Sequence, residues 1–285
     1  MASILAIKRR IKTARNVSKT TKALQMISAS KLKRAQDAAL ASRPYVEKLN
    51  FLSQELREKV DADQLHDYMV KPENTKAKLI IVISPDKGLC GGMITNVVRE
   101  VANLDPKEKL YFITIGKRAT KAVASLDKEI IASFDFGNTL PPFDIVYTLT
   151  KLAEEYFLGK KVSEVQILYT KFVNVFTVTP QFKTILPMEL EEMTEKKDSV
   201  TIFEPTLSEL MPSLLQHNLE MVIYQSLLEN YASEQASRMV AMKNSTDSAM
   251  EMIGELQLEY NKTRQSKITS EILDIGGAQA AINNG

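Results

Sequence analysis

A glycine-rich loop, SPDKGLCGG at residues 84–92, is the stretch whose residue types could take part in chemistry. It follows a predicted strand and precedes a predicted helix. Glycines in such a place allow backbone N–H groups to approach a phosphate at the helix N-terminus. The spacing matches neither G-x-G-x-x-G nor G-x-x-x-x-G-K-[ST], so it favours a structural turn formed by Gly88, Gly91 and Gly92. A nucleotide-dependent enzyme that uses this loop is one alternative.

Cys90 lies in the same loop and is the only cysteine of the chain. A thiol can act as a nucleophile when a nearby base activates it, but no histidine lies close to it in sequence. A single cysteine also excludes an internal disulfide and a multi-cysteine metal site. The two histidines, His66 and His217, are too few for a hydrolase triad. We therefore predict no catalytic residue, no metal and no cofactor in this chain.

The charge of the chain is divided unevenly between its two ends. Residues 1–36 contain ten Lys or Arg and no acidic residue, and the first 48 residues carry a net charge of +10. Because the whole chain carries only +2, the remainder carries −8. Such a division is typical of a chain with one end that meets an anionic partner. Nucleic acid, an anionic membrane surface and an acidic protein are all candidates on charge alone.

Two of these partner classes have little further support in the sequence. A nucleic-acid-binding helix would be expected to show a recognisable motif, and no aromatic residue precedes Tyr45. No apolar stretch approaches the ~20 residues of a membrane helix. The first residues, MASILAIKRR, place the charges after a short apolar run, whereas a secretory signal places them before it. We expect a cytoplasmic protein.

Residues 1–60 are predicted to form one long helix. The stretch has no glycine, and its only proline is Pro44, which could kink or split the helix. Such a helix would be about 85 Å long and must project from a domain of this size. Residues at alternating steps of three and four form a seam that is polar in its middle. The seam comprises Ile4, Ile7, Ile11, Ala14, Ser18, Thr21, Gln25, Ser28, Leu32, Ala35, Ala39, Ser42, Val46, Leu49, Ser53, Leu56 and Val60.

After a linker at 61–75, residues 76–205 alternate between short β-rich runs and helical patterns. This alternation predicts a Rossmann-like α/β domain with a mainly parallel sheet. The expected strands are 79–84, 110–115, 165–170 and 199–203, and the expected helices are 92–102, 117–125 and 143–158.

Residues 206–285 are predicted to form a second long helix. Thr206 and Glu209 have the spacing of a capping box, and Pro212 is expected to separate a first turn from the main helix. Its seam pairs with the first helix only if the two run antiparallel. The seam comprises Met239, Met242, Thr246, Ala249, Ile253, Leu256, Tyr260 and Thr263. A polar seam weakens packing, which a shaft held by a surrounding partner could tolerate.

Three blocks of sequence resemble the gamma subunit of bacterial F-type ATP synthase. They are IKRRIKTARNVSKTTKALQMISASKLKRAQ (7–36), SPDKGLCGG (84–92) and ENYASEQASRMVAMKNSTDSAMEMIGELQLEYNKTRQSKITSEI (229–272). The resemblance implies a rotor shaft of two antiparallel terminal helices, present once inside a ring of three alpha and three beta subunits. It implies a Rossmann-like foot that meets the epsilon subunit and the membrane c-ring, with no catalytic site in this chain. Proton-driven rotation would be coupled to ATP synthesis or hydrolysis in the ring.

The resemblance also implies residues that contact the beta subunits. Leu24 stands where the family usually has Met, and the swap conserves volume. One residue fewer than usual lies before Gly276 and Gly277, which would turn the last helical turn by about 100°. Membrane contact would occur only through the c-ring, at the cytoplasmic face of the bacterial plasma membrane. The implied contact residues are Lys19, Lys22, Leu24, Met26, Arg238, Arg264, Gln265 and Thr269.

Overall fold

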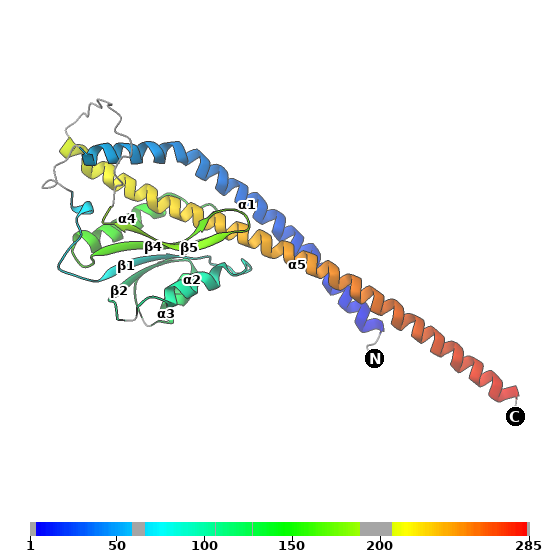
Figure 1. Ribbon diagram of the computed structural model, residues 1–285. Coiled ribbons are helices and arrows are strands. Elements are labelled where there is room, and N and C mark those ends of the chain that lie inside the picture. Colours follow the sequence, from blue (N-terminus) through cyan, green and yellow to red (C-terminus); the bar gives the residue numbers. More distant parts are fainter. Residues whose placement is uncertain (1–3, 59–65, 106, 127, 189–206, 284–285) are drawn as a thin grey trace. The chain divides into compact units, whose positions relative to one another are not determined.

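The computed structural model describes residues 4–58, 66–105, 107–126, 128–188 and 207–283 (Figure 1). The chain divides into two compact units. Residues 1–27 and 239–285 form the first unit, and residues 28–238 form the second. Two long helices, α1 (Ile4–Glu58) and α5 (Leu207–Asn283), each contribute to both units. Within the described ranges, no helix combines the length and apolar character needed to cross a membrane.

Both long helices continue through their prolines. α1 is unbroken at Pro44, and α5 passes through Pro212 without separation, so the predicted break at Pro212 is wrong. Pro212 lies in the second turn of α5, where a missing N–H removes only one intrahelical bond. α5 also continues through Gly276 and Gly277. Thr206 of the predicted capping box lies outside the described residues.

In the first unit, α1 and α5 pair antiparallel. Ile7 and Ile11 of α1 form an apolar cluster with Leu256, against which Tyr260 packs. Further along α1, the hydroxyl of Thr21 lies 2.7 Å from that of Thr246. The order of the contacts is reversed between the two helices, as an antiparallel coiled coil requires. The predicted fold of long antiparallel helices with a central α/β domain is confirmed.

The second unit contains a five-stranded sheet with strand order β3-β2-β1-β4-β5. The first four strands are mutually parallel, and β5 runs antiparallel to β4. The strands are β1 (Lys78–Ile83), β2 (Leu110–Ile115), β3 (Glu129–Phe134), β4 (Glu164–Phe172) and β5 (Val178–Leu186). The shorter helices are α2 (Met93–Ala102), α3 (Lys117–Ala124) and α4 (Asp144–Leu158), and a 3₁₀ turn spans Asp67–Met69.

The expected secondary structure of this region is largely confirmed. β1, β2 and β4 occur where apolar β-rich runs predicted them, and the three helices begin and end within one residue of their predicted bounds. β3 and β5 were not predicted. The expected strand at 199–203 lies outside the described residues.

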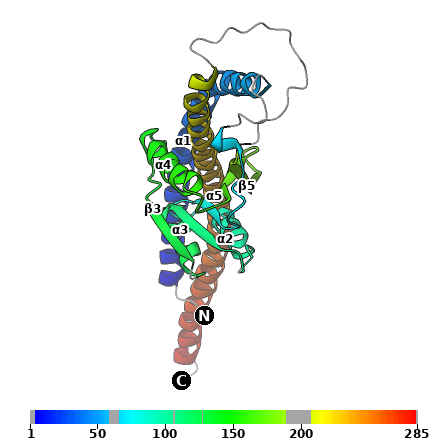
Figure 2. The same cartoon turned by 90° about the vertical axis from the view of Figure 1, so that its left-hand side faces the viewer.

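The core of the second unit lies on both faces of the sheet. α2 and α3 cover one face and α4 covers the other (Figures 1 and 2). Ile80 and Val82 of β1 belong to a buried cluster that also contains Val97 of α2 and Val123 of α3. The alternate residue Ile81 is also fully buried. A strand covered on both faces is expected to be a continuous apolar run, as LIIVI is.

Candidate functional site

The loop at residues 84–92 is held by the carboxylate of Asp86. Its Oδ1 accepts hydrogen bonds from the backbone N–H groups of Lys117, at 2.9 Å, and Phe136, at 3.4 Å. Its Oδ2 accepts from the N–H of Gly137 at 2.7 Å. Lys117 is the first residue of α3, where the backbone favours an anion. The carboxylate thus ties the loop to the N-terminal end of α3 and to the segment after β3, which supports the structural turn.

The remainder of the loop combines a buried thiol with an exposed apolar side chain. Cys90 is 1% exposed, and burial raises the pKa of its thiol. Leu89 next to it is 65% exposed and has a φ of 65°, a conformation that side chains rarely adopt. Gly91 has a φ of 58°, which glycine adopts without strain. Gly88 is half-buried and Gly92 is exposed.

Neither histidine is placed to activate Cys90. His66 accepts a hydrogen bond from the N–H of Tyr68 at the start of the 3₁₀ turn. His217 lies 3.0 Å from a carboxylate oxygen of Glu220 and also contacts the hydroxyl of Tyr45. In the described ranges, no group of three or more His, Cys, Asp or Glu side chains could hold a metal ion.

Arg238 is bound within the chain. Its Nη2 donates to Oε1 of Glu234 at 2.7 Å and to the carbonyl of Gly88 at 3.4 Å. Glu234 is almost fully buried, and this burial raises the pKa of its carboxyl, although Arg238 acts in the opposite direction. The side chain of Arg238 is only 13% exposed. Its visible role is therefore to tie the glycine loop to α5.

The other implied contact residues lie on the first unit, in two separate groups. On α1, Lys19, Lys22 and Met26 are exposed and Leu24 is half-buried. On α5, the exposed residues are Arg264, Gln265 and Thr269, and the Thr269 hydroxyl donates to the carbonyl of Gln265. Thr246, which faces Thr21, precedes Arg264 by eighteen residues, or about 27 Å of helix. The structure therefore does not bring the two groups together.

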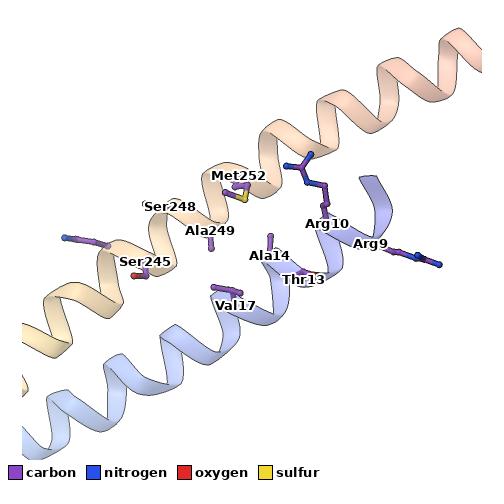
Figure 3. A pocket seen from close by; sticks show the side chains of 10 residues that line it. Arg9, Arg10, Thr13, Ala14, Val17, Ser245, Ser248, Ala249 and Met252 are labelled. Atoms are coloured by element: carbon purple, nitrogen blue, oxygen red, sulfur yellow. The ribbon is translucent and has the colours of Figure 1, made fainter. Parts of the chain in front are cut away.

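A groove between α1 and α5 in the first unit was not predicted from the sequence. It has a volume of about 680 Å³. Figure 3 shows Arg10 extending toward α5 and Arg9 pointing away from it, while Ala14 and Ala249 lie between the helices. Small residues at seam positions open this space, and they are the signal that could have indicated it. The lining comprises Arg9, Arg10, Thr13, Ala14, Val17, Asn244, Ser245, Ser248, Ala249 and Met252.

A buried polar stripe on α5 was also missed. Asn230, Ser233 and Glu234 are each at most 1% exposed in the second unit. In the sequence ENYASEQASR they have the composition of a solvated helix face. Their spacing of three and four residues, in a helix without glycine at this point, is the only signal that they share a face.

Comparison with known proteins gives a consistent result. A protein family described as ATP synthase matches residues 3–282. ATP synthase gamma chain of Dehalococcoides mccartyi is 35% identical over 284 residues, covering 99% of this chain and 100% of the relative. ATP synthase gamma chain of Ruthia magnifica subsp. Calyptogena magnifica is 37% identical over 289 residues, with the same coverage.

Solved structures with a similar fold include a rotor and a central stalk. The rotor of Euglena gracilis mitochondrial ATP synthase aligns with a TM-score of 0.67 and 18% identity, covering 93% of this chain and 98% of that chain. The central stalk and c-ring structure of Tetrahymena thermophila mitochondrial ATP synthase aligns with a TM-score of 0.59 and 22% identity, covering 79% and 98%. At these identities the likeness establishes the fold.

Proposed function

This chain belongs to the gamma-chain family of ATP synthases, and from that membership we propose that it is the central-stalk rotor subunit of a proton-translocating F-type enzyme. It couples rotation of a membrane c-ring to ATP synthesis or hydrolysis in a ring of alpha and beta subunits. The observation that carries this proposal is the family match from residue 3 to residue 282, across both long helices and the α/β domain. The nucleic-acid alternative gains nothing from that match.

The coupling is mechanical. An asymmetric shaft stabilises a different conformation of each surrounding subunit in each orientation, so rotation shifts their populations. In this proposal, residues 1–60 and 206–285 supply the shaft, 76–205 the foot and 61–75 the linker between them. Bond chemistry takes place in the partner subunits. The structural hydrogen bonds of Asp86 within the loop region and the buried thiol of Cys90 both support a non-catalytic chain.

The exposed cations of α1 suit an acidic partner surface. Lys19 and Lys22 are exposed, and the groove of the first unit has two arginines on its wall. Exposed ion pairs contribute only about 0–1 kcal/mol each. We therefore assign them to guiding the shaft past the beta subunits rather than fixing it. Further along, Arg264 can bind a carboxylate of a partner loop bidentately, with Gln265 beside it.

The proposed partners follow from the same role. The chain assembles as one copy with three alpha and three beta subunits, and its foot meets the epsilon subunit and the c-ring. It is peripheral, on the cytoplasmic face of a bacterial plasma membrane, and touches the membrane only through the c-ring. No cofactor and no nucleic acid takes part in this assignment.

Reconstitution tests the function directly. Matching alpha and beta subunits are mixed with and without this chain, and ATP hydrolysis and the stoichiometry of the complex are measured. We expect one copy per three alpha–beta pairs and a changed turnover rate. Well-folded components that form no complex and show unchanged turnover would refute the rotor assignment. In that case the basic helix is tested against DNA, where a steep salt dependence would be the diagnostic result.

A further inference from the structure

Two side chains of α5 hold one residue of β4 by its backbone. Oδ1 of Asn230 accepts a hydrogen bond from the N–H of Thr170 at 3.1 Å. The hydroxyl of Ser233 donates to the carbonyl of the same residue at 2.9 Å. All three residues are at most 1% exposed. We call these two hydrogen bonds the α5–β4 clamp.

The strand pairing gives the backbone of Thr170 limited support. On one side Thr170 lies opposite Pro180 of β5, which has no N–H to donate. On the other side, the pairing of β4 with β1 ends at Leu168. A buried N–H or carbonyl without a partner is costly, so an element that covers this position must supply one. Asn230 and Ser233 lie three residues apart on one helix face and supply both.

Two further links join the helices to the same edge of the sheet. Arg238 of α5 donates to the carbonyl of Gly88, in the loop that follows β1. The carbonyl of Asn138, beyond β3, accepts from Lys31 of α1 at 2.6 Å and from the hydroxyl of Tyr231 at 3.4 Å. These links contain exposed or half-buried groups, whereas every residue of the clamp is buried. Of the links named here, the clamp is therefore the polar link between α5 and the sheet that is best shielded from solvent.

Building on the proposed rotor function, we propose that the α5–β4 clamp is the joint through which the α/β domain turns α5. Burial of apolar surface is non-directional. Hydrogen bonds are directional, and two of them on the opposite backbone groups of one residue oppose both rotation of α5 about its axis and movement along it. Asn230 and Ser233 are then positioning residues of the rotor, which act through the helix that they hold.

The test compares a loaded with an unloaded rotor. The double variant Asn230→Ala with Ser233→Ala is assembled with alpha and beta subunits alone, and also into the complete complex in membrane vesicles. With alpha and beta subunits alone, the rotor carries no c-ring, and we expect ATP hydrolysis to stay near the wild-type rate. In vesicles, protons pumped per ATP hydrolysed fall several-fold because the joint slips under load. The proposal would be overturned if ATP hydrolysis without the c-ring fell as much as proton pumping in vesicles. It would also be overturned if the double variant pumped as many protons per ATP as the wild type.

Ser226→Ala is the matched control. Ser226 is also a buried serine of α5, but its hydroxyl donates to Val222 of its own helix. We expect this variant to pump as the wild type does. If the double variant does not assemble, Ser233→Ala alone is compared with Ser226→Ala in both assays, and equal pumping ratios contradict the joint. Failure of the wild-type chain itself to assemble would refute the rotor function instead.

Hydrogen exchange gives an independent readout. Loss of one neutral hydrogen bond changes a local opening equilibrium about fivefold, so Asn230→Ala should speed exchange of the Thr170 amide by about that factor. Ser226→Ala should leave the Thr170 amide unchanged. An unaltered rate in Asn230→Ala would show that the clamp does not hold β4, and the proposal would fall with it.

Discussion

The carboxylate of Asp86 accepts a hydrogen bond from the backbone N–H of Lys117 at 2.9 Å, and thereby closes the N-terminal end of α3 with an anion from the chain itself. Its other oxygen binds the N–H of Gly137. Asp86 follows β1, Lys117 follows β2 and Gly137 lies beyond β3. One side chain thus joins the carboxyl ends of three parallel strands, at the edge where related folds bind ligands.

Asp86→Ala should destabilise the chain by about 1–2 kcal/mol, since it leaves α3 uncapped and removes acceptors from three N–H groups. Urea unfolding of the isolated chain measures the loss. Asp247→Ala is the control, because Asp247 is exposed on α5. Equal losses in the two variants would show that the hydrogen bonds of Asp86 contribute nothing specific.

Gly116→Ala should be far more damaging. Gly116 has a φ of 96°, and an added Cβ would lie 1.8 Å from the carbonyl oxygen of Ser84. We expect a loss of more than about 3 kcal/mol or failure to fold. Gly254→Ala is the matched opposite: a Cβ there meets nothing within 4 Å, and replacing a glycine inside a helix should stabilise it by about 0.5–1 kcal/mol. Thermal unfolding of both variants tests the pair.

Arg264→Ala combined with Gln265→Ala should impair coupled turnover of the assembled complex without unfolding the chain. Both side chains are exposed, so the stability change should stay within about 0.5 kcal/mol. Lys262→Ala removes an exposed cation two residues before Arg264 on the same helix and serves as the control. ATP synthesis in vesicles is the measurement, and normal synthesis in the double variant would refute this contact assignment.

Glu229→Gln should stabilise the chain more at pH 8 than at pH 5. Burial raises the pKa of the Glu229 carboxyl above its ordinary 4.5, although Gln225, Lys171 and Lys183 lower it. Between 4.5 and the raised value the folded chain binds more protons than the unfolded chain, so wild-type stability falls as pH rises. Glutamine does not titrate and escapes this loss.

Urea unfolding across that pH range gives the difference between the Glu229→Gln variant and the wild type. The difference should grow as pH rises and then level off above the raised pKa. Glu255→Gln, at an exposed position of α5, should show no such growth. A constant difference for Glu229→Gln would contradict the assigned direction.

Cys90 should react slowly with thiol reagents in the folded chain. Its side chain is 1% exposed, and burial raises the thiol pKa, so both access and thiolate are limited. The reaction of the thiol is monitored by absorbance, and its rate should increase in denaturant. The comparison is Leu89→Cys in a Cys90→Ser background, which moves the thiol to the exposed neighbouring position. Equal rates for the two thiols would contradict the burial of Cys90.

Much of the fold is predictable because its signals are local. LIIVI and LYFITI are continuous apolar runs, and β1 and β2 form there. The helical seams are likewise borne out by burial at Ile7, Ile11, Leu32, Ala35, Met242 and Leu256. β3 was missed because it is an edge strand whose residues are mostly half-buried. β5 contains Pro180 and is the opposite edge strand, where proline is tolerated.

The site residues were harder to predict because their roles depend on distant partners. In the sequence SPDKG, Asp86 has the pattern of an ordinary turn residue. Only the fold brings it close to Lys117 and Gly137. Asn230 and Ser233 read as solvated positions, since nothing local shows that β4 covers them. Arg238 was assigned to a partner contact, and the structure shows that it is also bonded to Glu234 within the chain. Its contact with a beta subunit stays a prediction.

The hydroxyl pair of Thr21 and Thr246 joins residues separated by 225 positions. At about 5–20 residues per second, a ribosome needs roughly 10–45 s to make the second residue after the first. During that interval the newly made α1 has no partner for Ile7 and Ile11. Its ten cations and no anions in residues 1–36 repel the same segment of a neighbouring nascent chain. The same charge therefore opposes self-association of α1 while the rest of the chain is being made.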